Sequence, residues 1–342
     1  MSRQSNFELL RILAMFLIVA HHYSVHGGWN YPIGFEIHKF YAQSLSIGGK
    51  LGVNFFVLIS GYFLCKSKFK WDAITGTIAK TWFYSIAIML IFLLSGIGEV
   101  TPKTIIKSLL PFDYWFVNTF ICMLILSPFI NTLLNNLDKG NHLKLIILLC
   151  VFIWVPPLNK SVGHLSLFVC LYCTGSFLRT YYEEKRIPNR FFFTLIPIGV
   201  ALLLTSIAAI DYLSSFNINI IDPLYFTGNK SPLTFLLSIV IFIYFKQINI
   251  GSIKSINIVS STMFGVYLIH DHQFVRPFLW HHLFKNDTYL DSNLLYIHSI
   301  SAIIAVFVAC IVLDLIRSKV VAVLNLGFFQ RKLNHHLNKV SI

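Results

Sequence analysis

The first apolar run of the chain contains three ionisable side chains, Glu8, Arg11 and His22, whose types suit proton transfer and anion binding. A charged side chain at the centre of a membrane helix costs at least about 2.5–3.5 kcal/mol, so such residues indicate a function by default. Arg11 and His22 are eleven residues apart, close to three helical turns, and therefore share one helix face. Glu8, one turn earlier, can pair with Arg11. His22 lies roughly 16 Å further along the axis, where an imidazole can act as a general base near neutral pH.

Each of these residues also has a simpler interpretation. Glu8 and Arg11 can form a pair at the membrane surface that only sets topology. His22 can be a histidine satisfied within a core, and His21, rotated by about 100° on the helix, suits a packing or interfacial position. We expect no metal site, because no carboxylate or cysteine joins the neighbouring histidines at the spacing of ligands. Those histidines are His21, His22, His26 and His38.

The composition indicates which kind of element positions these side chains. Of the 342 residues, 56% are hydrophobic and 12% are charged, roughly half the charged share of a soluble domain. Apolar runs of about 20 residues, the length that crosses a bilayer, recur along the chain. The predicted fold class is therefore an all-α integral membrane protein with about ten transmembrane helices. The spans are predicted at residues 7–26, 48–65, 74–96, 114–134, 142–158, 161–181, 191–211, 231–246, 256–272 and 293–316.

The positions of Lys and Arg predict the orientation. With the N-terminus in the cytoplasm, 18 of the 27 Lys and Arg residues fall on the cytoplasmic side and eight on the other, which favours N-in and C-in. An eleventh span would reverse the C-terminus, and the segment from Phe274 to Phe284 is the candidate for a re-entrant or interfacial piece. The net charge of +13 is explained by these topology determinants beside anionic lipids, so we expect no nucleic-acid partner.

The two ends of the chain have separate predictions. The first apolar run should remain as a helix rather than be cleaved as a signal peptide, because it contains Glu8 and Arg11. Residues 1–316 are predicted to form one membrane-embedded domain. Residues 317–342 mix apolar and basic side chains, as a short interfacial helix on the cytoplasmic side would. The six cysteines all lie in apolar runs and form no disulfide framework or zinc pattern.

Four short strings follow one another in order between residues 7 and 270. They are Arg11-Ile12-Leu13-Ala14 followed by His22, Leu51 to Tyr62 (LGVNFFVLISGY), Asp113-Tyr114-Trp115-Phe116, and Phe264 to His270 (FGVYLIH). Together they resemble the motifs of the acyltransferase-3 family of bacterial membrane acyltransferases: an Arg-x(10)-His signature, a helix-2 motif, an aromatic entry to helix 4 and a late motif ending in histidine. The ten-span layout agrees with the usual topology of that family.

Two features depart from the family pattern. Asn54 stands where the family often has Asp. The Arg-rich start of the family's third helix is represented only by lysines, which are Lys66, Lys68, Lys70 and Lys80.

The resemblance implies an enzyme of the bacterial plasma membrane that transfers an acyl group, usually acetyl from cytosolic acetyl-CoA, to a hydroxyl of a cell-envelope or exported glycan. His22 is then the predicted base that takes the hydroxyl proton. Arg11 either holds the phosphate or pantetheine amide of the donor or orients the site through Glu8. The expected partners are membrane lipid, the acyl-CoA and the glycan, with no metal, and the sequence has no signal for an oligomeric state.

The same resemblance indicates where the two substrates bind. The lysines at 66, 68, 70 and 80 are candidates for contacts with CoA phosphates, although ordinary positive-inside lysines would look the same. Tyr114 and Trp115 can belong to an aromatic belt or stack on a sugar ring, and Ser60 is assigned to packing beside Gly61. The candidate acceptor-binding residues are Asn54, Tyr114, Trp115, Tyr267 and His270.

Two other classes of membrane protein remain as alternatives. A transporter or glycan flippase could use Arg11 and His22 in a substrate or proton pathway, but the sequence has neither an inverted repeat nor paired interrupted helices. A glycan polymerase also has about ten spans, but it would carry a longer outward loop than this chain offers. Acetyl-CoA-dependent release of free CoA distinguishes the acyltransferase from both.

Overall fold

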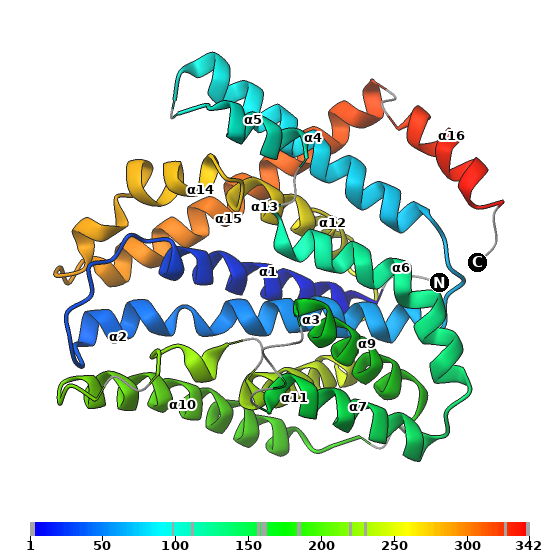
Figure 1. Ribbon diagram of the computed structural model, residues 1–342, viewed down its shortest axis with the longest axis horizontal. Coiled ribbons are helices and arrows are strands. Elements are labelled where there is room, and N and C mark those ends of the chain that lie inside the picture. Colours follow the sequence, from blue (N-terminus) through cyan, green and yellow to red (C-terminus); the bar gives the residue numbers. More distant parts are fainter. Residues whose placement is uncertain are drawn as a thin grey trace. The chain divides into compact units, whose positions relative to one another are not determined.

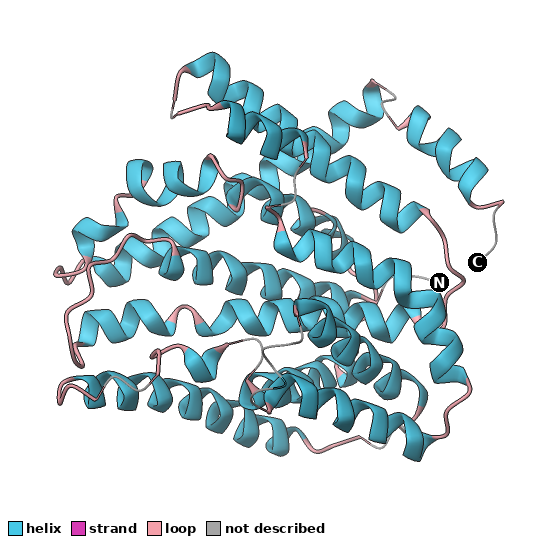
Figure 2. Cartoon of the chain, in the orientation of Figure 1, coloured by secondary structure: helices cyan, strands magenta, loops and turns pink. Residues whose placement is uncertain are grey.

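The computed structural model of the chain describes residues 4–97, 99–110, 113–155, 158, 163–182, 186–218, 221–228, 231–324 and 327–339. In these ranges the regular structure is helical and no strand occurs (Figure 2), which confirms the all-α fold class. All six cysteines are free.

The helices follow the predicted spans closely (Figure 1). Three short helices, η1 (Tyr225–Thr227), η2 (Phe278–Leu283, a π-helix) and η3 (Asn286–Tyr289), lie in the connections. The α-helices are α1 (Ser5–Val25), α2 (Ile37–Ser44), α3 (Ile47–Leu64), α4 (Asp72–Ser95), α5 (Pro102–Leu109), α6 (Trp115–Asn135), α7 (Lys139–Trp154), α9 (His164–Thr180), α10 (Asn189–Ser214), α11 (Pro232–Gln247), α12 (Lys254–Ser261), α13 (Met263–His270), α14 (Val275–Pro277), α15 (Leu295–Val323) and α16 (Phe328–Leu337).

Seven helical segments of the described chain are long and apolar enough to cross a bilayer. The chain is therefore a multi-pass membrane protein. The other three predicted spans correspond to shorter helices: α7 has 16 residues, α9 has 17, and the span at 256–272 is divided between α12 and α13. The total of ten and the orientation stay predictions. The seven segments are Ser5–Val25, Ile37–Leu64, Asp72–Ser95, Trp115–Asn135, Asn189–Ser214, Tyr225–Gln247 and Leu295–Val323.

The described chain divides into two compact units. The first contains Met1–Phe56, Glu184–Met263 and Arg276–Ala309, and the second contains Val57–Glu183, Phe264–Val275 and Cys310–Ile342.

In the first unit, α1 packs against α2, α11 and α12. Glycines on α3 permit close approach to α1: a Cβ on Gly52 would lie 2.5 Å from the carbonyl oxygen of Ala14, and one on Gly49 would lie 2.3 Å from the His21 side chain. Small residues at such contacts are the usual device of membrane helix packing. The start of α1 is tied down by a hydrogen bond from Asn6 Nδ2 to the carbonyl of Phe245 (2.8 Å).

In the second unit, α9 packs against α6 and α7, and α4 packs against α5, α6 and α16. A Cβ on Gly61 of α3 would lie 2.3 Å from the Tyr172 carbonyl oxygen, and one on Gly175 of α9 would lie 2.4 Å from that of Leu58. The two backbones touch at these glycines, which agrees with the packing role expected beside Gly61.

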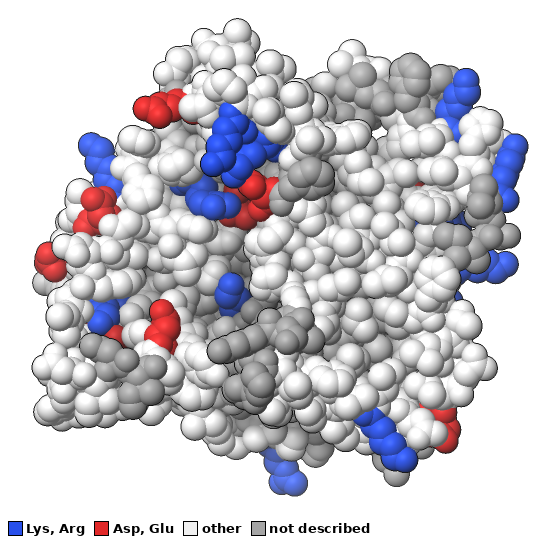
Figure 3. Space-filling view, in the orientation of Figure 1, with Lys and Arg blue, Asp and Glu red and all other residues white. Residues whose placement is uncertain are grey.

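Exposed side chains on the long helices are mostly apolar, for example Leu94 on α4 and Ile297 on α15. Figure 3 shows that, among the described residues, wide areas of the visible surface carry no charged side chain (Lys, Arg, Asp or Glu). Such an apolar surface suits contact with lipid tails, because water solvates apolar side chains poorly.

Candidate active site

Glu8 and Arg11 of α1 form the predicted pair. Arg11 Nη1 donates to Glu8 Oε1 at 2.5 Å, and Glu8 lies in the first helical turn, where the helix dipole favours a carboxylate. The other Glu8 oxygen accepts a hydrogen bond from Ser260 Oγ of α12. Glu8 is buried, whereas part of the Arg11 side chain stays exposed. The guanidinium is thus held in place from α12 through Glu8, with further donors left for another group.

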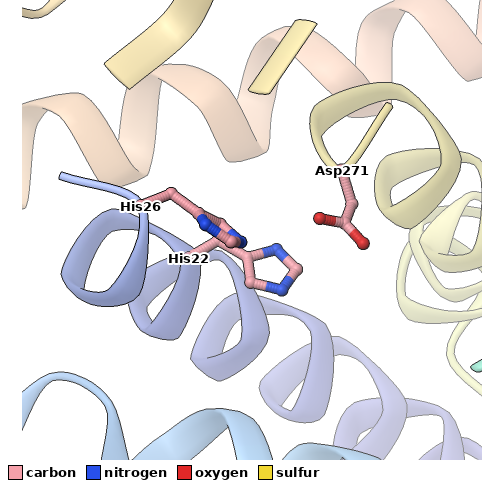
Figure 4. Close-up of side chains that lie close together, drawn as sticks. All are labelled: His22, His26 and Asp271. Atoms are coloured by element: carbon pink, nitrogen blue, oxygen red, sulfur yellow. The ribbon is translucent and has the colours of Figure 1, made fainter. Parts of the chain in front are cut away.

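His22 lies in the last turn of α1, which runs unbroken from Ser5 to Val25 as the spacing argument requires. Its ring lies beside that of His26, with centroids 5.2 Å apart, and Figure 4 shows the two imidazoles on one side of the helix end. Asp271, also labelled in Figure 4, belongs to the second unit. A buried imidazole in this position can accept a proton from a bound hydroxyl.

His21 has a different environment. Its Nδ1 lies 2.8 Å from the carbonyl oxygen of Ser46, and its side chain packs where Gly49 has no Cβ. This is the packing position that the helical rotation predicts for His21, and it makes the two adjacent histidines a natural experimental pair.

Asn54 of α3 is fully buried in the first unit. Its amide donates to Ser238 Oγ of α11 at 3.0 Å, while its Oδ1 has no hydrogen-bond partner among the described residues. A buried amide oxygen that lacks a partner is available to a donor from a ligand.

Tyr114, Tyr267 and His270 come together in the second unit. The Tyr114 hydroxyl donates to the carbonyl of Leu268 (2.8 Å), and its ring lies 5.8 Å from that of Tyr267. His270 is fully buried, with its ring 6.3 Å from that of Tyr267. Tyr114 is thus buried against α13 rather than exposed in an aromatic belt. Trp115 is half-buried, and its ring is tilted by 43° against that of His164, with the ring centroids 4.8 Å apart.

Three of the four lysines lie exposed between α3 and α4. Lys68 and Lys70 line a pocket of about 750 Å³, whose walls include Ile74, Leu124 and Asp72. Lys66 lines a separate and smaller cavity of about 140 Å³.

Lys80 is placed differently. Its Nζ lies 3.0 Å from Asp314 Oδ2, and this buried carboxylate also accepts hydrogen bonds from the Tyr84 hydroxyl (2.6 Å) and from Arg317 Nε (2.8 Å). A Cβ on Gly265 would lie 2.2 Å from Asp314 Oδ1, so the carboxylate fits tightly. The sequence grouped Lys80 with the other three lysines, but the structure gives it an intramolecular partner.

Several polar residues of the structure were not singled out from the sequence. Some are single carboxylates within apolar runs, and a charged residue in an apolar run is also the feature that singled out Glu8. The others are the hydrogen-bond or ion-pair partners of these carboxylates. The residues are Asp211 with Lys39, Asp314 with Arg317, and Ser260 as the partner of Glu8.

Comparison with known proteins identifies one family. The family model Acyl_transf_3, described as an acyltransferase domain, matches residues 4–315. Neither the curated proteins nor the solved structures provide a match.

Proposed function

Because the chain belongs to the acyltransferase-3 family, we propose that it transfers an acyl group, in the simplest case acetyl from cytosolic acetyl-CoA, to a hydroxyl of a cell-envelope or exported polysaccharide. The observation that carries the proposal is the extent of the family match, which includes Glu8, Arg11, His22 and the pocket beside Lys68. We place the protein in the plasma membrane, with both ends in the cytoplasm.

The donor is proposed to bind in the second unit. Lys68 and Lys70 are exposed point charges at the pocket of about 750 Å³, where they can meet the phosphates of CoA. The apolar wall at Ile74 and Leu124 suits the acyl-pantetheine arm. Lys80 is left out of this donor site because it pairs with Asp314.

The acyl transfer is proposed to use the residues of α1. His22 takes the proton from the acceptor hydroxyl while its oxygen attacks the thioester carbonyl. The tetrahedral intermediate collapses, the C–S bond breaks, and the CoA thiolate leaves and takes the proton from His22. Arg11, held by Glu8, supplies positive charge for the donor or for the developing oxyanion.

His22→Gln tests this function, because it keeps a side chain of similar size but removes the base. We expect turnover to fall roughly 10²–10⁴-fold, with the amount of folded protein unchanged. Turnover is measured with purified protein as CoA released from acetyl-CoA, together with the acyl mass gained by the glycan.

His21→Ala is the matched control. It should lower the thermal stability, because the contact with Ser46 is lost, and leave the turnover per folded protein close to wild type. A transporter or a polymerase would release no CoA in this assay. Full activity of His22→Gln, with activity lost in His21→Ala, would refute the assignment of the base.

A further inference from the structure

The first unit has a cavity of about 610 Å³ that the acyl-transfer residues do not use. Its walls come from the end of α1 and the loop after it, from α2, and from the end of α10 with the loop that follows. Ile33 at the rim is 82% exposed, whereas Asp211, Lys39 and Gln43 at the floor are 0%, 6% and 5% exposed. An open mouth above a few buried polar groups is typical of a ligand site.

The ammonium of Lys39 has three contacts within the protein. Its Nζ lies 2.8 Å from Asp211 Oδ1. It also donates to the carbonyl oxygens of Pro32 (3.0 Å) and Gly34 (2.9 Å). Two of its three hydrogens thus bind backbone carbonyls, and the ion pair with Asp211 offsets the charge that would attract an anionic ligand.

The floor nevertheless contains acceptors without donors. Asp211 Oδ2 and Gln43 Oε1 have no hydrogen-bond partner among the described residues. Buried polar atoms are nearly always paired, and an ionised carboxylate only accepts. A ligand group that binds these acceptors therefore donates hydrogen bonds, which hydroxyl groups do and fully ionised phosphate or carboxylate groups do not. A cationic ligand is disfavoured, since Lys39 already lies beside the same carboxylate.

Two aromatic side chains form another wall of the cavity. The rings of Trp29 and Tyr31 are stacked, 6.2 Å apart and within 16° of parallel. Trp29 is held by a hydrogen bond from Nε1 to the Ser24 carbonyl (2.6 Å). Burial and the charge of Asp211 raise the pKa of Tyr31, which keeps its phenol neutral. Aromatic faces carry partial negative charge and attract the polarised C–H groups of a sugar ring.

We propose that this cavity binds a neutral, hydroxyl-rich sugar unit, whose hydroxyls donate to Asp211 and Gln43 and whose ring lies against Trp29 or Tyr31. Resting on the proposed function, this unit is part of the acceptor glycan. Ser24, which lines the cavity, follows His22 by two residues on α1, a rise of about 3 Å and a rotation of about 200°, so the cavity lies close to the level of the base along the helix but on another side of it.

The direct test is calorimetric titration of the full-length protein in nanodiscs with neutral trisaccharides, chitotriose and maltotriose, and with trigalacturonate as an acidic probe. We expect saturable binding of a neutral probe and much weaker binding of the acidic one. Binding of neither neutral probe, or equal binding of the acidic probe, would overturn the proposal.

Gln43→Leu is the decisive variant, because Gln43 Oε1 has no hydrogen-bond partner to lose within the part of the chain that the structure describes, so the fold should tolerate the change. We expect roughly five- to tenfold weaker sugar binding, the worth of one hydrogen bond, and Trp29→Leu should act in the same direction. Asn30→Leu is the matched control: Asn30 is exposed in the same loop but does not line the cavity, so its affinity should equal wild type.

Release of CoA from acetyl-CoA, measured in parallel, separates this inference from the proposed function. Sugar binding that weakens in Gln43→Leu, without CoA release under any condition, would support the cavity and refute the acyl transfer. Acyl transfer whose acceptor KM is the same in wild type, Gln43→Leu and Trp29→Leu would refute the cavity and keep the function.

Discussion

Lys68 and Lys70 differ from Lys80 in their surroundings. We therefore expect substitutions of the first two to affect donor binding and a substitution of Lys80 to affect the stability of the fold. The first two are exposed at the pocket of about 750 Å³, while Lys80 pairs with the buried carboxylate of Asp314. Lys68→Gln with Lys70→Gln should raise the KM for acyl-CoA about tenfold per lost phosphate contact, with little change in kcat. Contacts far from the thioester act about equally in the ground and transition states.

Lys80→Met is the counterpart of that double variant. Removing one partner from a buried ion pair costs up to about 3–5 kcal/mol, so the variant should lose thermal stability and yield less folded protein. Its KM for acyl-CoA, measured on the folded fraction, should equal wild type. A raised KM in Lys80→Met at normal stability would return Lys80 to the donor site.

Single residues also show where inference from the sequence succeeds. The pairing of Glu8 with Arg11 was predictable, because partners three residues apart on one helix are set by local geometry. The contact from Ser260 to Glu8 joins residues 252 positions apart and depends on how α1 packs against α12, which no spacing encodes. The carboxylates Asp211 and Asp314 lie in apolar runs, as Glu8 does, but their pairing with Lys39 and Lys80 depends on tertiary packing that the sequence does not encode locally.

At the scale of elements, α16 is tied to the start of α4. Asn334 and Asn338 donate to the two carboxylate oxygens of Asp72, at 3.0 and 2.7 Å, and Asn338 Oδ1 accepts from the backbone of Trp71 (3.0 Å). Asp72 also lines the pocket of Lys68 and Lys70. The C-terminal helix therefore fixes one wall of the proposed donor site.

Asn334→Ala combined with Asn338→Ala should loosen that wall. Hydrogen bonds to a charged group contribute about 1.5–3 kcal/mol when well formed and less at an exposed site. We expect a several-fold higher KM for acyl-CoA and an unchanged kcat, measured from initial rates of CoA release. Asn136→Ala, which loses a hydrogen bond to the Thr132 carbonyl at the end of α6, is the control. An unaffected KM would limit α16 to a membrane-surface role.

The elements also show why hydropathy predicted the positions of helices better than their lengths. The span predicted at 48–65 is the second part of a longer segment, Ile37–Leu64, that begins with α2. Lys39 and Gln43 make α2 polar in sequence, although both are buried, Lys39 beside Asp211. Hydropathy counts these side chains as solvent-seeking, because it does not include their tertiary partners.

For the whole molecule, we expect reporters fused to either terminus to lie in the cytoplasm, because most Lys and Arg residues then lie inside. A cysteine introduced in place of the exposed Ile33 should react with a membrane-impermeant maleimide in intact cells, and one at Lys68 should react only after lysis. An outside C-terminal reporter would refute the ten-span count and point to an extra crossing near Phe274–Phe284.

The order in which the ribosome makes the first unit has a consequence for its biogenesis. The polar start of α1 finds some of its partners in segments made 239 to 252 residues later: Asn6 at Phe245 and Glu8 at Ser260. Translation at roughly 5–20 residues per second leaves a delay of roughly 12–50 s. During that time α1 must wait in or beside the insertion machinery with its carboxylate only partly neutralised. The second unit receives the stretch from Val57 to Glu183 without interruption, so its core can assemble before Asn6 and Glu8 meet these later partners.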